Sequence, residues 1–78
     1  MTTAPWAEES ARAILAIFKD KSVRAGGILT TSQVCTKFLT NGGSVFNYLA
    51  GVKYAIDHGW IEQLSTDFKL ADAGFAEL

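Results

Sequence analysis

Residues 44–60, SVFNYLAGVKYAIDHGW, contain the clearest helical pattern in the chain. Four apolar residues are spaced i, i+4, i+7 and i+11, which predicts one apolar seam along a helix: Val45, Leu49, Val52 and Ile56. Ser44 is a favoured N-cap residue, and Gly59 stands where a helix commonly ends in a left-handed residue. We therefore expect a half-buried helix over residues 44–58, with its seam packed on the rest of the chain.

The segments before this helix predict two further helices and a short strand. The first helix is expected to begin near Pro5, because proline suits the first helical position. Residues 28–29 are expected to form one rung of a small sheet. Thr30, an N-cap with Gln33 as its capping-box partner, is expected to begin a second helix that runs to about residue 39 or 40.

The segment after residue 59 predicts a β-hairpin, with strands at residues 60–64 and 68–70 and a tight connection between them. A last turn of helix over residues 71–78 is expected to dock through Phe75 and Leu78. The chain is therefore expected to be one domain over residues 1–78, mainly α-helical with a small β-hairpin.

Composition limits how so small a domain gains stability. A chain of 78 residues forms one domain at most, and short domains commonly need a disulfide, a metal or a second subunit. Cys35 is the only cysteine and His58 the only histidine, which excludes an intrachain disulfide and a four-ligand zinc site. Cys35 is expected to be a small buried hydrophobe. We expect no metal and no cofactor, and a homodimer is the remaining way to add stability.

Charge is distributed unevenly along the chain. The net charge is −1, yet residues 11–53 carry six Lys or Arg against Asp20 alone, and both ends are acidic. Such a basic middle segment is able to present a local basic face. The first residues do not have the pattern of a signal peptide, and no apolar run is long enough to span a membrane. We expect a cytoplasmic protein with no membrane partner.

Three local patterns resemble the winged helix-turn-helix family. They are GILT at residues 27–30, AIDHGWIE at 55–62 and FKLADAGFAEL at 68–78, the last with Ala71 where the family usually has Thr. The resemblance implies three helices and a two- to three-stranded wing sheet. It also implies that the third helix enters the major groove of double-stranded DNA while the wing contacts the flanking backbone.

Under this resemblance, the helix face opposite the seam is the candidate DNA contact. Asn47 offers an amide for an adenine edge, and Gly51 would let the helix approach closely. The remaining candidates are phosphate contacts: Thr31, Ser32, Lys37, Ser44, Lys53 and Tyr54. An ordinary solvated face, with Thr31 and Ser32 serving as helix caps, explains the same residues. The hypothesis is a small DNA-binding transcriptional regulator that uses residues 44–58 as its recognition helix and acts as a homodimer.

The alternative hypothesis is a winged-helix protein-interaction module that does not bind DNA. Phe46 and Tyr54 are aromatic residues that would be costly to expose without a partner, and Trp6 near the terminus is a candidate dimer contact. The acidic C-terminal part of the chain disfavours DNA. Catalysis finds no support, since one histidine provides no recognisable triad and the Gly-Gly pairs lack phosphate-loop spacing, so we do not expect an enzyme.

Overall fold

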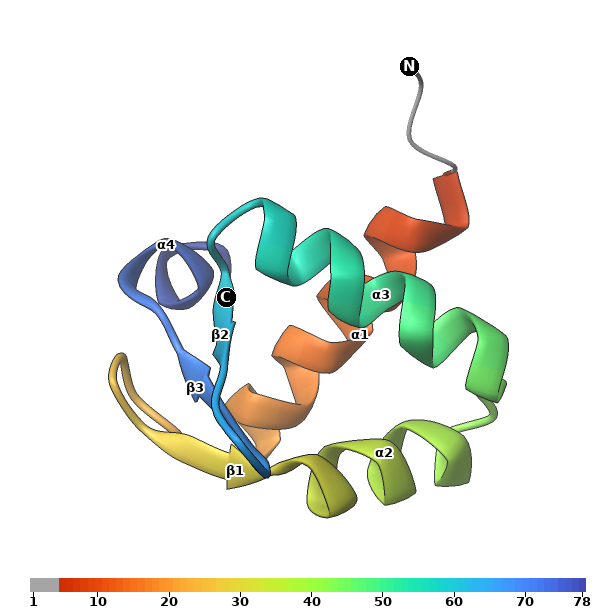
Figure 1. The fold of residues 1–78 in the computed structure, drawn as a ribbon, viewed down its shortest axis with the longest axis horizontal. Helices are drawn as coiled ribbons and strands as arrows, with labels where there is room; N and C mark the ends of the chain where they lie inside the picture. The colour runs from red at the N-terminus through yellow and green to blue at the C-terminus, as the bar shows by residue number, and fades with distance from the viewer. Residues whose placement is uncertain (1–4) are drawn as a thin grey trace.

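Four helices and three short strands make up residues 5–78, the part of the chain that the computed structural model describes (Figure 1). In chain order they are α1 (Pro5–Asp20), β1 (Ile28–Thr30), α2 (Thr31–Thr40), α3 (Val45–Asp57), β2 (Ile61–Gln63), β3 (Asp67–Leu70) and α4 (Asp72–Ala76). The fold is therefore mainly helical with a small antiparallel sheet, as the sequence predicts.

The start of α2, the start of α3 and the end of α3 are set by local chemistry and lie where the sequence predicts. The Gln33 N–H donates to Thr30 Oγ1 and the Thr30 N–H donates to Gln33 Oε1, both at 3.0 Å, which completes a capping box. At the start of α3, the Asn47 N–H donates to Ser44 Oγ at 3.1 Å. Gly59 follows α3 with a φ of 71°, a left-handed backbone that favours glycine.

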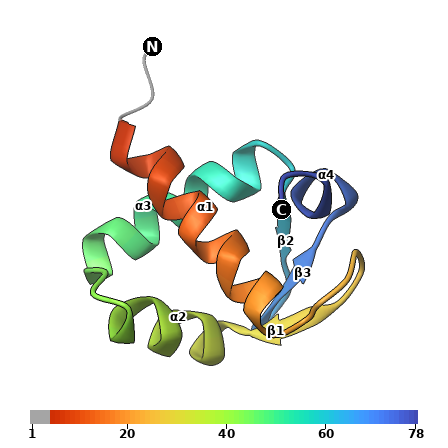
Figure 2. The ribbon, with the colours of Figure 1, turned by 180° about the vertical axis from the view of Figure 1, so that it is seen from behind.

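The sheet has the order β1-β3-β2, and both neighbouring pairs are antiparallel. Leu29 lies opposite Phe68, and Ile61 lies opposite Leu70. These four side chains are buried. In Figure 2, α1 crosses in front of α3 and ends beside the sheet. It provides the centre of the core with five side chains that are at most 2% exposed: Ala11, Ile14, Leu15, Ile17 and Phe18.

Helix α3 is rotated relative to the predicted seam. Val45 and Leu49 were expected in the core, but they are 57% and 60% exposed. The inner face of α3 consists instead of Tyr48, Gly51, Val52 and Ala55. The physical reason is a close approach to α1, because a Cβ at Gly51 would lie 2.8 Å from the carbonyl carbon of Ser10.

Helix α4 docks through a glycine, and the prediction that Phe75 and Leu78 would anchor it is wrong. Gly74 is buried with no room for a Cβ beside the Trp60 carbonyl oxygen, whereas Phe75 is 45% exposed and Leu78 is 37% exposed. The Arg12 guanidinium on α1 fastens this end, since it lies 3.0 Å from Glu77 Oε1 and 5.0 Å from the centre of the Trp60 ring.

No helix within residues 5–78 is both long and apolar enough to cross a membrane.

Candidate functional site

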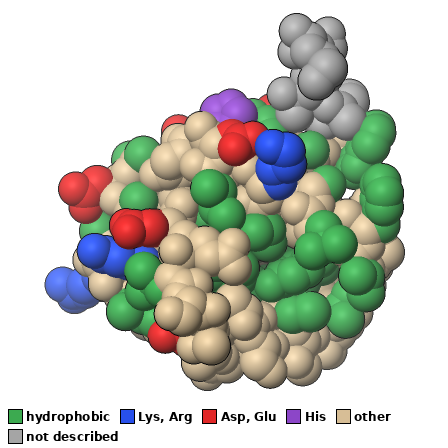
Figure 3. All heavy atoms as spheres, viewed as in Figure 1, with side chains coloured by type: hydrophobic (Ala, Val, Ile, Leu, Met, Phe, Trp, Pro, Cys, Tyr) green, Lys and Arg blue, Asp and Glu red, His purple; other side chains and the backbone are tan. Residues whose placement is uncertain are grey.

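The most unusual surface of the molecule is the side of α3 that faces away from the core. We call the outer face of α3 the set Val45, Phe46, Leu49 and Lys53. Phe46 is 71% exposed, which adds a third large apolar side chain to Val45 and Leu49. In Figure 3 the apolar side chains gather over the N-terminal half of α3. A contiguous exposed apolar surface of this kind commonly marks an interaction site.

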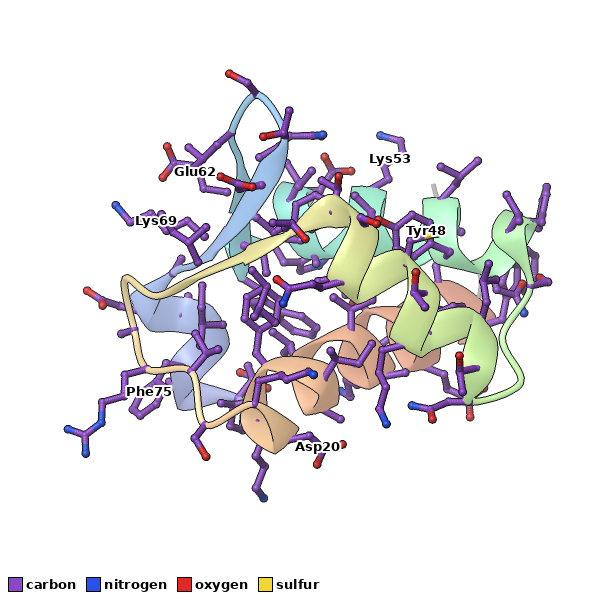
Figure 4. All side chains as sticks on the ribbon, turned by 90° about the horizontal axis from the view of Figure 1, so that it is seen from below. Asp20, Tyr48, Lys53, Glu62, Lys69 and Phe75 are labelled. Atoms are coloured by element: carbon purple, nitrogen blue, oxygen red, sulfur yellow. The ribbon has the colours of Figure 1, made fainter. Side chains whose placement is uncertain are left out.

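The one charged residue on the outer face of α3, Lys53, is balanced by the neighbouring Asp57. Lys53 Nζ lies 3.1 Å from Asp57 Oδ2, one helical turn away, and both side chains are well exposed. Figure 4 shows Lys53 at the opposite side of the molecule from Asp20, which ends α1. The one cation of this face is therefore already paired with a carboxylate.

A shallow pocket of about 410 Å³ continues the outer face between the start of α2, α3 and the hairpin. Leu49 belongs to both surfaces. The pocket lining has no charged residue: Thr31, Ser32, Cys35, Tyr48, Leu49, Val52, Gln63, Ser65 and Phe68. Cys35 is half-buried here, so it packs at the edge of the core rather than within it. Burial raises the pKa of the Tyr48 hydroxyl above its ordinary value, with a further contribution from Cys35.

Three predicted DNA contacts on α3 lie away from its outer face. Gly51 is buried against α1, so the expectation that it brings α3 close to DNA is wrong: the close approach is to Ser10. Tyr54 is half-buried, with its ring stacked on His58 at 3.9 Å between centroids and edge-on to Trp60 at 5.4 Å. Asn47 is also half-buried.

The remaining predicted contacts divide among different places. Ser44 caps α3, and the half-buried Thr31 donates its backbone N–H to the Thr66 carbonyl oxygen at 3.0 Å. Ser32 and Lys37 lie together in a second shallow pocket on α2, away from the paired Lys53. The structure therefore does not bring the eight predicted nucleic-acid residues onto one surface.

The two residues predicted for a protein interface are both exposed. Trp6, near the start of α1, is 46% exposed, and Phe46 is the most exposed large apolar side chain within residues 5–78. Sequence reasoning missed Val45 and Leu49, which it assigned to the core. The sequence did contain a sign of this exposure. Apolar residues occur around the whole circumference of the helix over residues 45–57, and one buried seam could not cover them all.

Within residues 5–78, no three His, Cys, Asp or Glu side chains come together in a way that could hold a metal ion. Comparisons of the chain with protein-family models, with curated proteins and with solved structures find no match. The argument about function therefore rests on the surfaces described above.

Proposed function

We propose that this chain is a winged-helix protein-interaction module whose outer α3 face binds the same face of a second copy. The order of elements supports the winged-helix part of this proposal. A helix, a strand, two helices joined by a glycine-containing turn and a hairpin follow one another as the resemblance implies, and the first strand joins the hairpin in one sheet.

The observation that carries the proposal is the exposure of three adjacent large apolar side chains on one helix face. Val45, Phe46 and Leu49 each leave more than half of their surface in water. Fully burying such a side chain is worth about 1.5–3 kcal/mol. The gain from covering all three offsets part of the entropy that association costs.

A second copy suits this face for two reasons. The chain is small and its single cysteine allows no internal disulfide, so an additional apolar contact would add stability where little is to spare. A two-fold contact places the same patch against itself. Because Lys53 is neutralised by Asp57 within each copy, bringing two such faces together sets no uncompensated like charges against each other.

DNA recognition by α3 receives less support and stays a prediction. A recognition helix in the major groove offers donors and acceptors to base edges, and the surrounding surface offers unpaired cations to phosphates. The outer face of α3 offers three apolar side chains and one cation that is already paired. If this surface read DNA, no contact would compensate for the exposure of these three apolar side chains to water.

The decisive test is the mass of the protein in solution as a function of concentration. Sedimentation equilibrium is measured at protein concentrations up to about 1 mM. This range detects even a weak dimer, whose free energy of association is only about 4 kcal/mol. We expect the wild type to form a dimer and Phe46→Ser to be a monomer. Phe75→Ser is the matched control, because Phe75 is also an exposed phenylalanine but lies on α4, and it should leave the dimer intact.

Nuclear magnetic resonance on dilution locates the contact. Amide shifts of residues 45–53 should move as the dimer dissociates, while those of the α4 segment should not. A wild type that remains a monomer at every concentration would overturn self-association. A dimer whose shifts change elsewhere would overturn the assignment to α3, and a titration with duplex DNA that moves the α3 amides would favour the DNA hypothesis.

A further inference from the structure

The pocket beside α3 opens on one flank of the helix, and Phe46 projects from the other flank. We call this hollow of about 410 Å³ the hairpin pocket, and α3 contributes Tyr48, Leu49 and Val52 to its lining. Phe46 does not belong to the lining, and its side chain is 71% exposed. One helix therefore presents an exposed aromatic ring and an uncharged hollow that its own ring does not fill.

Helical spacing places Phe46 and Val52 symmetrically about Leu49. Each is three residues from Leu49, which corresponds to about 4.5 Å along the helix axis and about 60° around it, in opposite directions. A two-fold axis that passes through Leu49 at right angles to α3 reverses both displacements. It therefore sets the partner's Phe46 over Val52, on the flank where the hairpin pocket opens.

The same rotation matches the remaining residues of the outer face. Val45 and Lys53 each stand four residues from Leu49, so the partner's Lys53 comes over Val45. A lysine covers apolar surface with its methylene stem while its charged head stays in water. Lys53 Nζ already lies 3.1 Å from Asp57 Oδ2, so this contact isolates no charge. One rotation thus gives each exposed apolar residue of the outer face a counterpart, which favours a second copy as the occupant.

The hairpin pocket suits a phenyl ring in size and in chemistry. Its volume falls within the range of about 300–1,000 Å³ that is typical of small-molecule sites. Val52 and Phe68 are buried side chains of the lining, and Cys35 adds a half-buried thiol. No charged residue lines the pocket, so an entering ring desolvates no charge. Figure 4 shows Lys53 and the hairpin tip on the same side of the molecule, so the hairpin stands beside the outer face.

We propose that Phe46 of each copy inserts into the hairpin pocket of the other copy, across a two-fold axis through Leu49. This inference rests on the proposed function, which is self-association through the outer face of α3. It extends the contact from α3 to the start of α2 and to the hairpin. A two-fold contact forms every unlike pairing twice, so two rings fill two pockets in the dimer.

An isotope-filtered nuclear magnetic resonance experiment tests the insertion directly. Equal amounts of ¹³C-labelled and unlabelled chain are mixed at a concentration where sedimentation shows a dimer, and only contacts between copies are recorded. We expect cross-peaks between the Phe46 ring of one copy and the Val52 methyl groups of the other. In a dimer whose two Phe46 rings meet at the axis, the rings would contact each other and the Val52 cross-peaks would be absent. That result would refute the insertion.

Cys35 provides a second readout without any substitution, because it is the only cysteine of the chain and lines the hairpin pocket. Its alkylation by N-ethylmaleimide is measured at increasing protein concentration. If only the monomer reacts, the rate constant falls about tenfold where about nine tenths of the chain is dimeric. Phe46→Ser should react at the same rate at every concentration. A wild-type rate that stays constant while the dimer forms would contradict the proposal.

A matched pair of hairpin variants tests whether the pocket must be empty. Ser65 lines the pocket and its neighbour Thr66 does not, and both are exposed. Ser65→Trp places an indole in the hollow and should weaken the dimer by about tenfold or more. Thr66→Trp adds the same side chain outside the hollow and should leave the dimer unchanged. Circular dichroism confirms that both variants fold, and equal dimerisation of the two would count against the insertion.

The failure of this inference differs from the failure of the proposed function. A wild type that stays a monomer at every concentration contradicts both. A dimer that shows neither the cross-peaks between Phe46 and Val52 nor the protection of Cys35 overturns the insertion alone and leaves self-association through α3 standing.

Discussion

The inner face of α3 contains small residues that its outer face lacks. The inner face contains Gly51 and Ala55 among its buried residues, whereas the outer face presents Val45, Phe46 and Leu49 to water. Both faces are apolar. The small residues permit the close contact with α1 that sets which face is buried, and this orientation leaves Val45, Phe46 and Leu49 available for another molecule.

The largest expected difference in the free energy of unfolding is between substitutions at two neighbouring residues, Tyr48 on the inner face and Leu49 on the outer face. Tyr48 is 8% exposed and its ring packs against Phe38 at 5.7 Å between centroids, so Tyr48→Ala should lower the free energy of unfolding by about 3 kcal/mol or more. Leu49→Ala removes a side chain that is mostly in water and should change it by about 0.5 kcal/mol or less.

Urea unfolding at a concentration low enough to keep the protein monomeric measures both values, so that a dimer contact of Leu49 does not contribute. If Leu49→Ala costs as much as Tyr48→Ala, the predicted seam is correct and the orientation of α3 described above is wrong.

Gly51→Ala tests which face of α3 is buried, through the sign of the change in the free energy of unfolding. In an exposed helix position, glycine to alanine stabilises by up to about 1 kcal/mol through helix propensity. Here the added methyl would lie 2.8 Å from Ser10 and 3.0 Å from the backbone nitrogen of Ala11. We expect Gly51→Ala to lower the free energy of unfolding by about 1–3 kcal/mol, because α1 and α3 must separate.

Ala50→Gly, at the adjacent and more open position, gives the reference value for helix propensity alone, a loss of about 1 kcal/mol. Thermal or urea unfolding of both variants provides the comparison. A Gly51→Ala protein that is more stable than wild type would show that Gly51 faces solvent, as the sequence interpretation supposes.

How much of this could be predicted from the sequence depends on how far apart the interacting residues are. The caps at Thr30 and Ser44 and the end at Gly59 were predicted, because each depends on residues within one helical turn. The rotation of α3 was not, since it depends on the distance to Ser10 in another helix. Spacing identifies apolar positions but does not say which of them meets α1.

The candidate site shows the same limit. Phe46 was predicted as an interface residue from its chemistry alone, and it lies on the outer face of α3. Its neighbours Val45 and Leu49 were assigned to the core, because the seam and the exposed patch use residues of the same kind. The pairing of Lys53 had a sign in the sequence, because Asp57 follows it at i+4 on the same helix, whereas no carboxylate stands three or four residues from Lys37.

The smallest expected effect is a pH dependence of the free energy of unfolding, which arises from Tyr48 on the inner face of α3. Burial first, and Cys35 second, raise the pKa of Tyr48 in the folded protein above its ordinary value of 10.0. The folded state therefore holds this proton more tightly than the unfolded state. The resulting stability is fully present below pH 10.0 and is lost as the pH rises through the folded pKa.

Tyr48→Phe removes this hydroxyl while it keeps the buried ring. Between about pH 8 and about pH 11 the wild type should lose more free energy of unfolding than Tyr48→Phe, since all other titrating groups are common to both proteins. Urea unfolding at the two pH values measures the difference. Equal losses would mean that the Tyr48 hydroxyl is as well hydrated as an exposed one, and the inner face would then end before the Tyr48 hydroxyl rather than enclose it.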